Sequence, residues 1–166
     1  MKIIDYNRQK ALSYAKRYAF SRNVAYLDFS SLGGDCTNFC SQCLYAGARQ
    51  MNYTPTFGWY YNSALDRAPA WTGVNPFYKF LTDNIVVNRI GTGLGPFGEE
   101  SDLRDLKLGD FIQLGDGSTY YHCLIIVGFK GRMPLVASHS IDSYEKPLAE
   151  YNYARARGIR ILGVRV

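Results

Sequence analysis

The feature that most constrains the fold is the order in which two kinds of hydrophobic pattern follow each other along the chain. Apolar and aromatic residues recur with helical spacing in the first half, and strand-like patterns occupy the second half. The helical patterns cover residues 7–20, 35–47 and a segment that begins near Gly73. The strand patterns cover residues 111–114, 119–129, 133–138 and 160–166. This order predicts an α+β fold, with N-terminal helices packed against a C-terminal antiparallel β-sheet.

Glycines mark two connections in this plan. Asp116-Gly117 lies between the first two predicted strands, and Asp-Gly is a strong hairpin signal, so these strands are expected to be antiparallel neighbours. Upstream, residues 93–98 (GLGPFG) have the spacing of a dinucleotide-binding fingerprint, with residues 85–90 as a candidate preceding strand. Because Pro96 lies inside the motif and no second β-α-β crossover follows, we interpret this segment as a flexible loop.

Length and charge restrict the classes of protein to which the chain can belong. A length of 166 residues suits a single domain over residues 1–166. The net charge of +5 favours anionic partners, but the basic residues are scattered, so no specific nucleic-acid partner is predicted. No stretch is apolar enough to span a bilayer, and the first residues lack the apolar run of a signal peptide. The expected location is the cytoplasm, unless a segment outside this chain exports the protein or lysis releases it.

Cysteines are concentrated in the second predicted helix. Cys36, Cys40 and Cys43 are spaced i, i+4 and i+7, so they share one helix face, and Cys123 lies in a predicted strand. Cys36 alone stands in the first turn, where unpaired backbone N–H groups and the helix dipole stabilise an anion. The sequence therefore predicts a lowered pKa for the Cys36 thiol and a role as nucleophile. The other three cysteines are expected to pack as small hydrophobic residues.

The residues before Cys36 fit this role. Gly33 and Gly34 let the backbone approach closely and leave room for a substrate. Asp35 offers a carboxylate that would cap the helix, although its charge would oppose a thiolate. The N–H groups of the first turn would form an oxyanion hole for a tetrahedral intermediate.

Only two histidines are available to serve as a base. His122 lies early in the strand 119–129, and His139 follows the strand 133–138, so antiparallel pairing of these strands would bring both rings toward one site. We predict that His122 is the general base and that His139 orients it, with Asp142 as the alternative orienting group. The predicted reaction is hydrolysis of an amide bond through a thioester. It requires no metal and no cofactor.

Several segments, in the order of the chain, resemble a bacterial family described as putative amidase domains. The most specific is residues 34–47 (GDCTNFCSQCLYAG), and the others are residues 6–18, 71–74, 105–113, His122, 139–142 and 147–148. The family is grouped with papain-like cysteine peptidases and amidases, including the CHAP type, many of which act on cell-wall peptides. Cys40 departs from the family pattern, in which an aliphatic residue is expected.

The resemblance implies a papain-like fold, with a nucleophilic cysteine at a helix N-terminus, a histidine on a neighbouring strand and a third residue on the next strand. These roles fall on Cys36, His122 and His139. It also implies a peptide or peptidoglycan substrate. Amidases, endopeptidases and acyltransferases share the first half-reaction, so the bond that is cleaved stays open, as does the oligomeric state.

Two other classes of function also stay open. The first is an inactive papain-like binding module, in which Trp59-Tyr60-Tyr61 and Trp71 would stack on sugars or peptides, although such aromatics more often anchor loops or the core. The second is a thiol-ligated metal or iron–sulfur protein that uses the three thiols of residues 36–43. A helix would spread these sulfurs over two turns, which disfavours a cluster.

Overall fold

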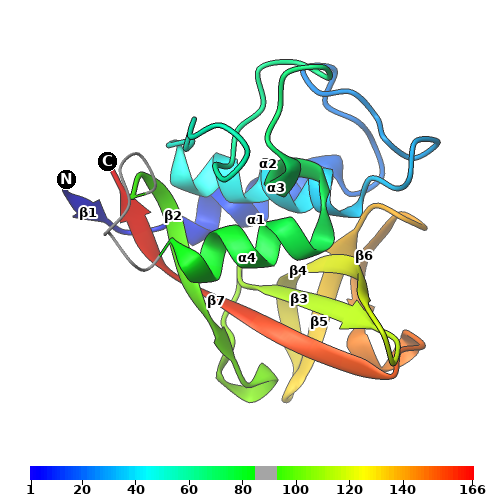
Figure 1. The fold of residues 1–166 in the computed structure, drawn as a ribbon. Helices are drawn as coiled ribbons and strands as arrows, with labels where there is room; N and C mark the ends of the chain where they lie inside the picture. Colours follow the sequence, from blue (N-terminus) through cyan, green and yellow to red (C-terminus); the bar gives the residue numbers. More distant parts are fainter. Residues whose placement is uncertain (85–92) are drawn as a thin grey trace.

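Helices lie over one side of a curled antiparallel sheet in the computed structural model, which describes residues 1–84 and 93–166 (Figure 1). The helices are α1 (Arg8–Tyr18), α2 (Cys36–Ala48), α3 (Pro69–Thr72), α4 (Val74–Asp83) and the short 3₁₀ turns η1 (Leu103–Asp105) and η2 (Leu148–Glu150). The strands are β1 (Ile3–Ile4), β2 (Gly95–Ser101), β3 (Phe111–Gly115), β4 (Tyr120–Lys130), β5 (Met133–Ser138), β6 (Ser143–Pro147) and β7 (Arg155–Arg165). The predicted α+β fold is confirmed.

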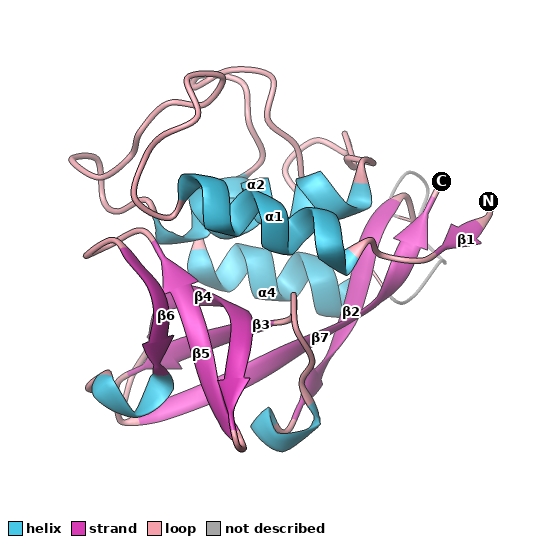
Figure 2. Cartoon of the chain, turned by 180° about the vertical axis from the view of Figure 1, so that it is seen from behind, coloured by secondary structure: helices cyan, strands magenta, loops and turns pink. Residues whose placement is uncertain are grey.

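The strands form one sheet in the order β1-β7-β3-β4-β5-β6, with β2 paired to β7. The predicted hairpin is present, because β3 and β4 are joined by a turn in which the Asp116 side chain accepts hydrogen bonds from the N–H groups of Ser118 and Thr119, both at 2.8 Å. The sheet curls into a half-barrel below α1, α2 and α4, and the two long loops around α2 lie on the far side of the helices (Figure 2). Within residues 1–84 and 93–166, no helix is both long and apolar enough to cross a bilayer.

The register between β4 and β5 determines what lies beside the start of β4. The two strands are antiparallel neighbours, as predicted, and their pairing begins at Ile125↔Ala137 and continues away from His122. The first residues of β4 therefore extend beyond the part of the strand that β5 covers. This uncovered end lies next to the first turn of α2.

The flexible loop predicted at the glycine-rich motif is wrong from Gly95 onward. Residues Gly95–Ser101 form β2, which pairs with β7, and proline is tolerated in such an edge strand. A Cβ at Gly98 would lie 2.4 Å from the Arg160 carbonyl oxygen, so glycine is required here for close approach of two strands. The candidate strand at residues 85–90 lies outside the described residues.

Helix α2 is buried on almost every side, and two tryptophans from the following segments form hydrogen bonds with it. Trp59 donates its ring N–H to Ser41 Oγ at 3.0 Å, and Trp71 donates to Asn38 Oδ1 at 2.9 Å. Neither tryptophan has exposed surface. These two residues are therefore anchors of the core, as expected, and they are not available to stack on a sugar.

Candidate active site

Cys36 is the first residue of α2, and the backbone that leads to it is unusually open. Gly33 and Gly34 have φ of 103° and 114°, a conformation that residues with a side chain rarely adopt. A Cβ built on either glycine would meet no atom within 4 Å. The chain thus offers uncovered main chain directly before the cysteine, where the main chain of a substrate can lie.

The Cys36 sulfur reaches the sheet at the uncovered end of β4. It accepts backbone hydrogen bonds from Cys123 and Thr37, and it lies 3.8 Å from Thr37 Oγ1. Burial nevertheless raises the pKa of the thiol, because only 7% of Cys36 is exposed and the hydrogen bonds offset desolvation only in part. The lowered pKa predicted from the helix N-terminus is therefore wrong for the free protein, in which the thiol is neutral.

His122 directly precedes Cys123, whose backbone holds the sulfur. Its Nδ1 lies 3.4 Å from Ser140 Oγ, and its ring lies against Tyr151 with centroids 5.8 Å apart. Burial, with a smaller contribution from the charge of Lys146, lowers the pKa of His122 to about 4. The imidazole is consequently neutral at physiological pH and able to accept a proton.

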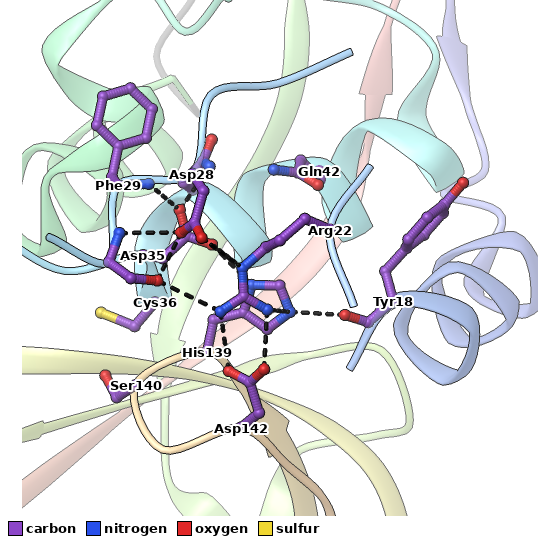
Figure 3. A network of polar contacts seen from close by, with 12 residues as sticks. Tyr18, Arg22, Asp28, Phe29, Asp35, Cys36, Gln42, His139, Ser140 and Asp142 are labelled. Carbon is purple, nitrogen blue, oxygen red and sulfur yellow. Dashed lines mark hydrogen bonds and ion pairs between the residues drawn. The ribbon is translucent and has the colours of Figure 1, made fainter. Parts of the chain in front are cut away.

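His139 lies near the start of α2, and both of its ring nitrogens contact residues other than His122. Nδ1 is 2.7 Å from Asp35 Oδ2, and Nε2 is 2.6 Å from the Tyr18 carbonyl oxygen (Figure 3). The ring stacks on Phe39 with centroids 4.0 Å apart. The structure therefore brings His139 to Asp35, the residue before the cysteine.

Ser140 and Arg22 are residues of this site that the sequence reading missed. Continuing the β4–β5 register two residues past the end of β5 places position 140 opposite His122, a signal that could have indicated Ser140. Asp142, the alternative orienting group, instead receives two hydrogen bonds from Arg22, at 2.8 and 3.1 Å. Arg22 comes from the loop between α1 and α2, where no sequence pattern pointed to it.

Comparison with known proteins shows the family of the chain. The family described as "Putative amidase domain" matches residues 5–162. The chain belongs to this family. It is 32% identical over 144 residues to the uncharacterized protein YhbB of Bacillus subtilis (strain 168), a match that covers 84% of this chain and 43% of YhbB. The chain thus spans less than half the length of this relative, and no solved structure shows a significant match.

In this amidase-family domain, Asp35 occupies the N-cap position of α2 without capping the helix through its side chain. Its carboxylate instead accepts hydrogen bonds from the Phe29 N–H and from Asn38 Nδ2, both at 2.8 Å, in addition to its contact with His139. The predicted side-chain cap is wrong because these three partners, from the preceding loop, the helix and the segment after β5, already occupy the carboxylate. Asp35 thereby connects three segments directly before Cys36.

The remaining cysteines of the amidase domain are enclosed. Cys40, Cys43 and Cys123 are free thiols with no exposed surface, and burial raises the pKa of Cys40 and Cys43 well above the ordinary thiol value. In the part of the chain that the structure describes, no three His, Cys, Asp or Glu side chains are arranged to hold a metal ion. The geometry gives no support to the alternative of a metal or iron–sulfur site on α2.

The lowered pKa of His122 makes the stability of the fold depend on pH. Between about pH 6.5 and about pH 4 the unfolded chain binds a proton at His122 that the folded chain does not, so acidification favours unfolding, by about 3 kcal/mol at most. We expect urea unfolding at about pH 7 and about pH 4.5 to show a larger drop in free energy for the wild type than for His122→Gln, which does not titrate. Equal drops in the two proteins would contradict a neutral, buried His122.

Proposed function

We propose that this domain hydrolyses amide bonds, with Cys36 as nucleophile and His122 as general base. The observation that carries the proposal is the position of the Cys36 sulfur. The sulfur lies at the N-terminus of α2 and accepts a backbone hydrogen bond from Cys123, the neighbour of His122 in β4. Membership of an amidase family supports the same chemistry. On this proposal the domain is a papain-like, CHAP-related cysteine hydrolase, as the family resemblance implies.

The reaction starts from a neutral thiol and a neutral imidazole, because burial disfavours the charged form of both groups. His122 accepts the thiol proton as the sulfur attacks the carbonyl carbon, and backbone N–H groups in the first turn of α2 bind the oxyanion that forms. The tetrahedral intermediate then expels the amine, which takes the proton from His122 and leaves a thioester on Cys36. Water attacks the thioester with His122 again as base, which releases the acid and restores the thiol.

Ser140 is the side chain that orients His122 in this proposal, since its Oγ faces Nδ1 and leaves Nε2 for the proton transfer. We expect Ser140→Ala to lower kcat by roughly threefold to tenfold, the equivalent of one hydrogen bond. Ser118→Ala, in the exposed β3–β4 turn, is the matched control and should retain wild-type turnover. Equal turnover of both variants would remove Ser140 from the site.

A peptide of the bacterial cell wall is the proposed substrate, on the basis of the family resemblance and of the uncovered main chain at Gly33 and Gly34. The test is incubation of the protein with purified peptidoglycan, followed by mass spectrometry of the soluble products. A new amine and a new carboxylate at one defined amide bond, absent with Cys36→Ala, would support the proposal. Absence of cleavage at every amide bond would exclude the wall substrate, and the mass of any product would distinguish an amidase from an endopeptidase.

A further inference from the structure

We infer that His139 is a positioning residue that carries protons on both ring nitrogens and thereby neutralises Asp35 beside Cys36. The inference goes beyond the proposed base and nucleophile, and its importance for catalysis rests on the proposed role of Cys36. Asp35 and His139 are each 1% exposed and in contact at 2.7 Å, so the pair is enclosed by protein (Figure 3). Asp35 immediately precedes Cys36 in the chain, and its contact brings His139 to the start of α2.

The first argument is the nature of the atom nearest to each ring nitrogen, since the other neighbour of Nε2, Arg22 Nη1, is further away at 3.3 Å. Nδ1 lies 2.7 Å from a carboxylate oxygen of Asp35, and Nε2 lies 2.6 Å from the carbonyl oxygen of Tyr18. Carbonyl and carboxylate oxygens only accept hydrogen bonds, so contacts this short require an N–H at each nitrogen. An imidazole with both N–H groups is the imidazolium cation.

The second argument is the electrostatic setting of the ring. Tyr18 is the last residue of α1, so Nε2 lies at the negative end of that helix dipole, where cations are stabilised. Phe39 of α2 covers the ring face and excludes water from the pair.

The third argument is the balance of charge around the pair. Arg22 is the other cation that faces it, with Nη1 3.3 Å from His139 Nε2 and Nε 3.7 Å from Asp35 Oδ2. Arg22 also contacts Asp28 at 3.3 Å and Asp142 at 2.8 Å. Together with Asp35 there are three carboxylates and one guanidinium, an excess of two negative charges. An imidazolium at His139 halves this excess in a place where an unpaired buried charge is costly.

The consequence concerns the thiol. A negative charge next to Cys36 disfavours the thiolate, and an imidazolium that neutralises Asp35 removes this opposition. Replacement of His139 by a neutral residue would leave Arg22 as the remaining cation at Asp35, at the longer distance of 3.7 Å between Arg22 Nε and Asp35 Oδ2. The Cys36 thiol would then ionise at a higher pH, even though His139 never contacts the substrate.

Nitrogen NMR tests the protonation state directly. The chain has two histidines, so ¹⁵N-histidine-labelled protein gives four ring nitrogens, and His122→Gln identifies which belong to His139. At about pH 7 we expect both His139 nitrogens to show protonated shifts and slowly exchanging N–H protons, while His122 shows one unprotonated nitrogen. An unprotonated nitrogen on His139 would overturn the inference, whether its proton is missing or resides on Asp35.

Alkylation by iodoacetamide tests the effect on Cys36 and needs no substrate. Peptide mapping reports modification of Cys36 itself, and Cys36→Ser gives the background. At about pH 7 we expect His139→Gln to react roughly threefold to tenfold more slowly than the wild type, with its pH profile displaced upward by the corresponding half to one pH unit. The double variant Asp35→Asn/His139→Gln removes both charges and should recover the wild-type profile.

The double variant separates charge from structure. If both variants are slowed equally, or if His139→Gln reacts as fast as the wild type, His139 does not act through the charge of Asp35 and the inference fails. Because neither measurement uses amide hydrolysis, failure of the proposed function would leave them unchanged. Conversely, the proposed hydrolysis can hold with a neutral His139.

Discussion

Replacement of Cys36 by alanine is expected to lower amide hydrolysis by roughly 10⁴-fold to 10⁶-fold, since the thioester path requires the sulfur and no neighbouring group can replace it. Cys40, Cys43 and Cys123 have no exposed surface, so no second thiol is positioned to attack a substrate. The measurement is the initial rate of product release from purified peptidoglycan, followed by mass spectrometry.

The matched control for this change is Cys43→Ala. Cys43 lies two turns further along the same helix and is fully buried. It has no role in the proposed reaction. It should retain activity comparable to that of the wild type, at a modest cost in stability. If Cys36→Ala kept more than about a tenth of the activity of Cys43→Ala, the nucleophile would be wrong.

Replacement of His122 by glutamine is expected to lower turnover by roughly 10²-fold to 10⁴-fold, the usual contribution of a general base. Glutamine has a similar size and cannot accept the thiol proton, so the loss reports the proton transfer rather than packing. Circular dichroism and the midpoint of urea unfolding at about pH 7 would confirm that the variant is folded.

The pH dependence of the rate gives the second readout for His122. As the pH falls through about 4 the imidazole takes up a proton and can no longer act as base, so the wild-type kcat/KM should decline there. This acidic limb should be absent from the residual activity of His122→Gln. A limb that persists unchanged in the variant would assign the titration, and the role of base, to another group.

Much of the fold follows from local pattern. Helical spacing predicted α1, α2 and α4, and Asp116-Gly117 predicted the β3–β4 hairpin, because in these segments the local preference and the tertiary burial agree. The strand β2 was missed because its glycines were taken as a sign of flexibility. The glycines instead allow the backbone of β2 to lie close to that of β7. This need for glycine becomes visible only when the pairing of the two strands is known.

The position of Cys36 at the start of α2 was predictable from the sequence, but the partners of the two histidines were not. The ring of His122 lies against Tyr151 and has Ser140 at its Nδ1. His139 follows Ala137 on the face toward the helices, where it stacks on Phe39. The two rings therefore have different partners, which come from segments distant in the chain and which the sequence alone does not show.

The pKa of Cys36 shows a second limit of reading from sequence. A cysteine at a helix N-terminus with glycines before it predicts a thiolate, yet the depth of the residue is set by the loops and the sheet that close over α2. Burial raises the pKa of the thiol in the folded protein, and it does so through segments far from Cys36 in the chain. The local motif places Cys36 at the start of a helix, and the tertiary packing determines the resting charge of its thiol.

The most direct test of the central claim is detection of the acyl-enzyme. Wild-type protein mixed with purified peptidoglycan is quenched in acid at short times, digested and analysed by mass spectrometry. The account predicts a transient added mass, equal to the acyl part of the cleaved bond, on the peptide that contains Cys36, and its absence in Cys36→Ala. Product formation with no adduct on Cys36 at any time, and at an equal rate in Cys36→Ala, would contradict the account.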